Sequence, residues 1–154
     1  MMKRMIATVV AVWAVASPAL AEESVRVFDA WARASILASR PGAAYVTIES
    51  ASDDTLIGAS TPVAEQVMIH SVEMDGDVSR MKHIETLELP AGEQITLAPG
   101  GMHLMLMGLQ HKLTEGMTFP IAIRFENAGE VTVEVSVLGI AAVGLENSER
   151  GAGQ

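Results

Sequence analysis

Cysteine is absent from this chain of 154 residues, and its absence excludes several kinds of protein. Without a thiol the chain forms no disulfide bond and takes no part in thiol–disulfide exchange. It also lacks the Cys-x-x-Cys-His sequence to which haem is covalently attached. Copper electron carriers of the blue-copper and dinuclear types need a cysteine ligand, so both types are excluded as well.

Basic residues and long apolar runs are also scarce. The chain has 10 Lys and Arg against 19 Asp and Glu, which gives a net charge of −9. An acidic surface argues against binding to nucleic acid or to an anionic membrane face. The longest apolar run, Ile6–Ala16, is too short for a transmembrane helix. We therefore expect no nucleic-acid partner and no stable insertion in a membrane.

The N-terminus has the pattern of a secretory signal peptide. Lys3 and Arg4 precede the apolar run Ile6–Ala16, and Ala19-Leu20-Ala21 matches a small-residue cleavage site. We expect a signal peptide over residues 1–21, a single periplasmic domain over residues 22–144 and a polar C-terminal tail over residues 145–154. An uncleaved signal anchor is the less favoured alternative, because the cleavage pattern is present.

Beyond the signal peptide, short runs of β-forming residues alternate with turn residues such as Pro41-Gly42 and Pro99-Gly100-Gly101. No apolar period of 3.6 residues persists long enough for a sizeable helix. This spacing predicts an all-β protein, an antiparallel β-sandwich of eight or nine strands. Val131–Val137 alternates most cleanly and should have one face in solvent. The predicted strands are Val25–Phe28, Ala44–Ile48, Thr55–Ala59, Gln66–Val72, Val78–Ile84, Gln94–Leu97, His103–Gly108, Thr118–Phe125 and Val131–Val137.

Methionine and histidine, by contrast, are concentrated in one stretch. All four histidines and seven of the ten methionines lie between Met68 and Met117, most densely in Met102–Met107. Alternate side chains of a strand share a face, so His103 and Met105 should stand side by side. The Gly100-Gly101 turn before them should place His103 at an exposed strand end.

A hairpin is predicted to supply a second pair of this kind. Asp75-Gly76 is a favoured two-residue type I′ turn, and this turn would place His70 directly opposite Met81 and His83 opposite Met68. Their Cβ atoms would then be about 4.5–5.5 Å apart. A longer loop through Asp77 would shift the register.

Together the two pairs would form a metal site of two histidines and two methionines: His70, Met81, His103 and Met105. Thioether is a poor ligand for zinc, and calcium and magnesium require oxygen. Cu(I) accepts both soft sulfur and imidazole without a charged ligand. The pattern therefore predicts a Cu(I) site.

The other histidines and methionines have plainer interpretations, because methionine often fills irregular gaps in a core. We expect Met68, Met102 and Met117 to pack in or beside the core, and His111 to lie on the surface. Whether Met74, Met107 and His83 pack, lie in solvent or assist a metal stays open.

The spacing of the four candidate ligands resembles that of the periplasmic copper chaperone A family, PCu(A)C. His70 and Met81 are separated by ten residues, Met81 and His103 by twenty-one, and His103-Leu104-Met105 completes the pattern. The resemblance extends over about residues 24–140. Similar flanking strings are Asp29-Ala30-Trp31-Ala32-Arg33, Gly42-Ala43-Ala44-Tyr45, Pro99-Gly100-Gly101 and Leu104-Met105-Leu106-Met107-Gly108-Leu109.

The resemblance implies a cupredoxin-like, immunoglobulin-like Greek-key sandwich that binds one Cu(I) through His70, Met81, His103 and Met105. It also implies delivery of copper to the dinuclear centre of cytochrome c oxidase, sometimes beside Sco-type thiol proteins. Some family members have a C-terminal tail rich in His and Met, but residues 141–154 contain neither, so we expect no second site there. Trp31 and Arg33 are assigned to packing and to a surface or corner contact.

The preferred hypothesis is a non-enzymatic copper metallochaperone. A periplasmic protein of copper storage or tolerance, a copper redox enzyme and a metal-free interaction domain are the alternatives. Hydrolytic catalysis is disfavoured because Ser71 and its neighbour His70 would point to opposite faces of a strand. The chain also lacks the Gly-x-Ser-x-Gly sequence of a nucleophile elbow.

Overall fold

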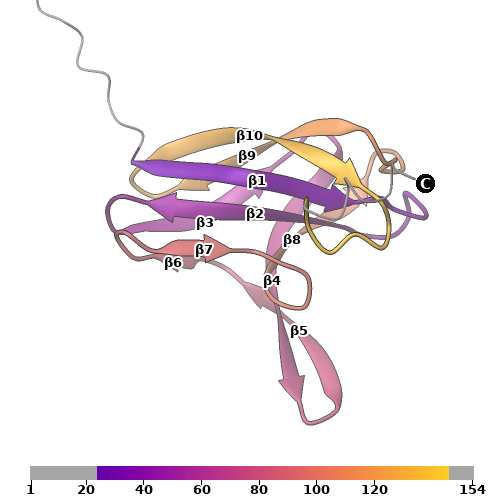
Figure 1. Cartoon of the computed structure of the whole chain (residues 1–154), viewed down its shortest axis with the longest axis horizontal. Coiled ribbons are helices and arrows are strands. Elements are labelled where there is room, and N and C mark those ends of the chain that lie inside the picture. The colour runs from indigo at the N-terminus through magenta and orange to yellow at the C-terminus, as the bar shows by residue number, and fades with distance from the viewer. Residues whose placement is uncertain (1–23, 146–154) are drawn as a thin grey trace, which may run out of the picture.

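The structure is a computed structural model that describes residues 24–145. These residues form ten β-strands, and the prediction of an all-β protein is confirmed (Figure 1). Among the described residues, no helix is both long enough and apolar enough to span a bilayer. The strands are β1 (Val25–Arg33), β2 (Gly42–Ser50), β3 (Asp54–Ser60), β4 (Ala64–Asp75), β5 (Val78–Ile84), β6 (Leu87–Leu89), β7 (Gln94–Thr96), β8 (His103–Leu109), β9 (Thr118–Phe125) and β10 (Gly129–Leu138).

Seven of these strands close into a barrel-like ring. They pair in the order β4-β8-β2-β1-β10-β9-β3, and β3 returns to β4 through Ala59 and Val67. The strands β5, β6 and β7 extend this ring by pairing with β4, β3 and β2. The expected antiparallel pairing holds around the ring except between β1 and β10, which run parallel.

The core fills the inside of the ring with alternate side chains of the strands. Leu104 and Leu106 of β8 are fully buried, as is Val135 of β10. Along β10, Thr132 and Glu134 are exposed between the inward residues, which confirms that one face of this strand lies in solvent. Because two inward residues of β8 are leucines of the core, the alternate residues of the same strand must point outward.

A smaller cluster lies outside the main core, around Trp31 and Tyr45. Their ring centroids are 4.4 Å apart, and the Nε of Arg33 donates a hydrogen bond of 2.7 Å to the carbonyl oxygen of Ala142. The packing role of Trp31 and the corner contact of Arg33 are therefore confirmed. Leu145 also packs against this cluster, although we predicted it to begin a polar tail. The rest of that tail and the predicted signal peptide lie outside the described residues.

The β4–β5 hairpin projects away from the ring (Figure 1). Its turn is formed by Gly76 and Asp77, and Asp75 pairs with Val78. The predicted turn, Asp75-Gly76, was therefore wrong by one residue. Gly76 has φ +63°, whereas Asp77 is not in the left-handed region. A positive φ at the first central position alone is the mark of a type II′ turn, which favours glycine there.

The two faces of this hairpin differ in chemistry. One face is charged: Arg80 approaches Asp75 to 3.1 Å, and Lys82 approaches Glu73 to 3.6 Å. The other face has no ion pair among the described residues and presents histidine, valine and methionine side chains. This second face continues onto β8 and contains the candidate metal ligands.

Candidate metal centre

His70 and His103 are direct partners across the β4–β8 pair. Their ring centroids are 5.9 Å apart, with the ring planes at 82°. Neither the hairpin nor its turn sets this contact, since the register of β4 against β8 extends from Ala64 to His70. The structure thus brings together two of the four predicted ligands from segments far apart in the sequence.

Met105 lies beside His103 on the same face of β8, as the alternation predicted. It is half-buried and pairs with Met68 of β4, which stands beside His70. Met68 therefore belongs to this outward face, although we predicted that it would pack in or beside the core. Met102, by contrast, packs against the core as expected. We call the outward face of β4, β5 and β8 the His–Met face, and its histidines and methionines are Met68, His70, Met74, Met81, His83, His103, Met105 and Met107.

Met81 is not opposite His70, and this prediction is wrong. In the observed register Met81 pairs with Val72, so it stands diagonally from His70, one step nearer the hairpin tip. Diagonal neighbours lie about 7–8 Å apart, a distance that a long side chain can bridge. Met81 is 61% exposed. It lies on the same face as the other three predicted ligands but farther from them than the sequence suggested.

His83 takes the position that was predicted for Met81. It pairs directly with His70, and their ring centroids are 5.5 Å apart with the planes at 90°. The predicted pairing of His83 with Met68 is therefore wrong. Three imidazoles now lie in a row across β5, β4 and β8, with His70 in the middle. Sequence reasoning missed this row because the turn had been placed one residue too early.

The Nδ1 atom of His70 is buried and has no hydrogen-bond partner. A buried polar atom without a partner is unusual and costs free energy. Burial lowers the pKa of His70 below its ordinary value, and the charges of His103 and His83 lower it further. The imidazole is therefore held in its neutral form, which is the form that binds a metal.

His103 is buried, with 6% of its surface exposed, although we expected it at an exposed strand end. It is the first residue of β8, but the turn at Gly100, with φ +83°, folds the preceding segment beside it. The ring Nδ1 lies 3.4 Å from the carbonyl oxygen of Gly101, a long and weak contact. The burial of His103 by the segment before it thus differs from the exposed position that the sequence suggested.

The site as it stands is a set of neighbouring donors and not a closed cage. Among residues 24–145, no three His, Asp or Glu side chains converge closely enough to hold a metal ion. The donors within reach are neutral imidazole and thioether, a set that suits a soft monovalent ion such as Cu(I). His111, the fourth histidine, is exposed beyond β8, as predicted.

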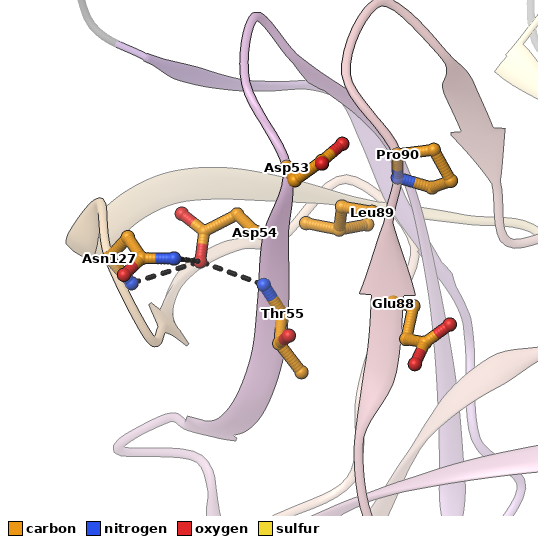
Figure 2. A pocket seen from close by; sticks show the side chains of 7 residues that line it. All are labelled: Asp53, Asp54, Thr55, Glu88, Leu89, Pro90 and Asn127. Carbon is orange, nitrogen blue, oxygen red and sulfur yellow. Dashed lines mark hydrogen bonds between the residues drawn. The ribbon is translucent and has the colours of Figure 1, made fainter.

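A cavity of about 430 Å³ lies away from this face, between β3 and β6, and is lined by Asp54 and Asn127 among others (Figure 2). Asp54 is 6% exposed, yet it accepts hydrogen bonds from the backbone amides of Thr55, Asn127 and Ala128. Burial raises the pKa of this carboxyl group, but those hydrogen bonds outweigh burial and the net pKa is lowered. Because its acceptor atoms are already used, Asp54 fixes the turn after β9 and offers little to a ligand.

The comparisons with known proteins bear on this arrangement. The profile of the LpqE-like family, described as putative lipoprotein LpqE-like, matches residues 25–137. The chain belongs to the LpqE-like family. This is the family of the PCuAC domains, so the resemblance seen in the sequence is confirmed. A curated relative is the putative lipoprotein Lxx21020 of Leifsonia xyli subsp. xyli, which is 29% identical over 124 residues, 79% of this chain and 74% of the relative.

Two solved structures of the family are similar in fold. The Cu(I)-bound form of DR1885 from Deinococcus radiodurans is 32% identical, with 80% of this chain and 83% of that one covered and a TM-score of 0.57. The copper-bound PCuAC domain from PmoF2 is 24% identical, with 75% and 93% covered and a TM-score of 0.64. These LpqE-like proteins share the all-β fold of the present chain, and both were solved with copper.

Proposed function

We propose that this chain is a copper metallochaperone that holds one Cu(I) on the His–Met face. His70 and His103 form the centre of the site, Met105 lies beside them, and Met81 reaches in from the hairpin. The single observation that carries the proposal is the direct pairing of His70 with His103, with Met105 as the next outward residue. The copper-bound relatives support the identity of the metal.

The surroundings of His70 favour capture of a soft cation. Its pKa is lowered, so the ring is neutral at the pH of most compartments, and its buried Nδ1 gains no hydrogen bond from the protein. Binding to a metal fixes the orientation and tautomer of the ring. The thioether of Met105 carries no proton and no charge, so it adds a soft donor without a desolvated anion.

Transfer of the ion would proceed by ligand exchange and needs no catalysis. Met81 is the most exposed of the four proposed ligands and lies on the projecting hairpin, where an acceptor can approach first. Thiolate is a stronger ligand for Cu(I) than thioether, so an acceptor with cysteine would draw the ion away stepwise. The proposed acceptor is the dinuclear copper centre of cytochrome c oxidase, or a Sco-type thiol protein that serves it.

The proposal includes export to the periplasm. Residues 1–21 would act as a cleaved signal peptide, residues 22–144 as the copper-binding domain and residues 145–154 as a tail. The names of the family and of its curated relative, both putative lipoproteins, support an exported protein. We also assign the ring to the cupredoxin-like, immunoglobulin-like Greek-key sandwiches, which a continuous core between mostly antiparallel strands supports.

The test is a competition titration of Cu(I) against a chromogenic chelator under reducing conditions. We expect one Cu(I) per chain, and at least a tenfold weaker affinity in Met105→Leu, which removes the thioether but keeps the volume. The matched control is Met102→Leu, because Met102 packs against the core immediately before the same strand. Equal affinities in Met105→Leu, Met102→Leu and the wild type would refute the proposal.

A further inference from the structure

His83 is a histidine that the proposed Cu(I) site does not use. It is exposed on β5, and its ring stands 5.5 Å from that of His70, nearer than the 5.9 Å between His70 and His103. Met81, the proposed ligand from the same strand, is only diagonal to His70. On the hairpin, His83 is therefore better placed than Met81 to share an ion with His70.

We infer that His83 completes, with His70 and His103, a second mode of binding on the same face: a three-imidazole site for Cu(II). This inference rests on the proposed function in sharing His70 and His103. Cuprous ion would use two imidazoles and the thioethers, whereas cupric ion, which prefers nitrogen and oxygen donors, would use three imidazoles and water.

The distances between neighbouring rings are compatible with this mode. Two imidazoles that share one ion, with metal–nitrogen bonds of about 2 Å, have ring centroids no more than roughly 6.3 Å apart. Both neighbouring pairs in the row, at 5.5 and 5.9 Å, lie within this limit, whereas the outer pair, His83 and His103, must come together before one ion can contact all three rings. After closure the ion would lie above His70, with one ring on either side.

Closure requires the two outer rings to lean toward the centre. β5 and β8 lie on opposite sides of β4, so their backbones are about 10 Å apart at two strand spacings. His83 is on the projecting hairpin and exposed, and it can change rotamer without disturbing the core. His103 is buried, so most of the movement falls to His83.

The central ring also favours this mode. The buried Nδ1 of His70 has no partner, and the rings that face His70 are two other imidazoles and not carboxylates. The nearest anions on the hairpin, Glu73 and Asp75, are on its opposite face in ion pairs with Lys82 and Arg80. A divalent ion at this place is thus recognised by nitrogen, which selects Cu(II) above zinc in the Irving–Williams order.

The experiment compares Cu(II) and Cu(I) binding in the same proteins. Cu(II) affinity is measured by competition with glycine, and the ligand nitrogens are counted by electron paramagnetic resonance. We expect His83→Ala to weaken Cu(II) binding about tenfold or more and to remove one imidazole coupling. Met105→Leu should show the reverse preference and weaken Cu(I) binding more than Cu(II) binding. His111→Ala, which removes an exposed histidine outside the row, is the matched control.

The outcomes separate the inference from the proposed function. If Cu(I) binds to the wild type but His83→Ala leaves Cu(II) affinity and its nitrogen couplings unchanged, the inference is wrong and the chaperone proposal stands. If Cu(II) binds through three imidazoles but Cu(I) does not bind, the chaperone proposal is wrong. Displacement of Cu(II) by an equimolar amount of zinc would overturn the assignment to copper.

Discussion

The Nδ1 atom of His70 and the carboxylate of Asp54 are both buried polar groups, yet their surroundings are opposite. Asp54, the first residue of β3, accepts hydrogen bonds from three backbone amides and from the Asn127 side chain. His70 Nδ1, on the His–Met face, has no partner. The comparison teaches that burial alone does not identify a functional group. A buried group whose hydrogen bonds are all made stabilises the fold, whereas a buried group without a partner can bind a ligand.

The same comparison explains why the cavity beside Asp54 is not the candidate site. That cavity has a volume of about 430 Å³, but its buried carboxylate is already committed to Thr55, Asn127 and Ala128 (Figure 2). On the His–Met face, by contrast, the buried Nδ1 of His70 has no partner. Donor chemistry is therefore a better guide to a soft-metal site than cavity volume is.

The largest expected effect is on Cu(I) affinity and comes from removing His70, whose buried Nδ1 has no hydrogen-bond partner. His70→Ala removes the central imidazole, and we expect Cu(I) affinity to fall by about 100-fold or more, because loss even of an outer-sphere partner costs 10–100-fold. The free energy of unfolding should change by less than about 1 kcal/mol, since Nδ1 makes no hydrogen bond that can be lost. Cu(I) titration and urea denaturation of the same variant measure the two quantities. A large loss of stability with unchanged Cu(I) affinity would reverse the roles assigned to the two regions.

The reciprocal variant, Asp54→Ala, should be destabilised and still bind copper. It leaves the backbone amides of Thr55, Asn127 and Ala128 without their acceptor. We expect the free energy of unfolding to fall by about 2–4 kcal/mol, because hydrogen bonds to a charged group are among the stronger ones. Urea denaturation measures this loss. Cu(I) affinity below the unfolding midpoint should equal that of the wild type, and a parallel loss of affinity would show that the two regions are coupled.

The stability supplied by Asp54 should also depend on pH. Its pKa in the folded protein is lowered below the ordinary value of 3.8. A lowered pKa in the folded state means that the stabilisation is complete above the unfolded-state pKa and is lost as the pH falls through the folded-state pKa. The difference in stability between the wild type and Asp54→Ala should therefore be constant near neutral pH and shrink below about pH 4. A difference that grows in acid would contradict the sign of the shift.

The smallest effect is expected on the charged face of the hairpin. Arg80 and Asp75 are about 70% exposed, and exposed ion pairs contribute about 0.2–1 kcal/mol. Arg80→Ala should lower the free energy of unfolding by no more than this and leave Cu(I) affinity unchanged. Met81→Leu, one residue along on the opposite face, should weaken Cu(I) binding, though less than Met105→Leu does. If the two hairpin variants have equal Cu(I) affinities, Met81 is not a ligand.

Much of the fold could be predicted from local pattern. The limits of β5 and β9 were predicted to the residue; Asp75-Gly76-Asp77 precedes β5, and Asn127-Ala128-Gly129 lies just beyond β9. β6 was missed, since a three-residue strand, Leu87–Leu89, is too short to show alternation. The parallel pairing of β1 with β10 joins the two ends of the domain, and no local signal specifies so distant a contact.

The candidate site shows both the strength and the limit of such reasoning. Alternation along β8 correctly placed His103 beside Met105 and opposite to the core leucines. The hairpin register was wrong because the Asp75-Gly76-Asp77 segment is compatible with two different two-residue turns. Moving the turn by one residue changes every cross-strand partner by two positions but leaves each side chain on its face. The residues that lie on the His–Met face could therefore be predicted, whereas the cross-strand partner of His70 on β5 could not.

The most direct test of the central claim is X-ray absorption at the copper edge of the protein loaded with one Cu(I). If Cu(I) is held on the His–Met face, the spectrum will contain both imidazole nitrogen and thioether sulfur in the first shell. The sulfur contribution will decrease in Met105→Leu and persist in Met102→Leu. A first shell of nitrogen and oxygen alone, or a sulfur contribution that Met105→Leu does not alter, would contradict the account.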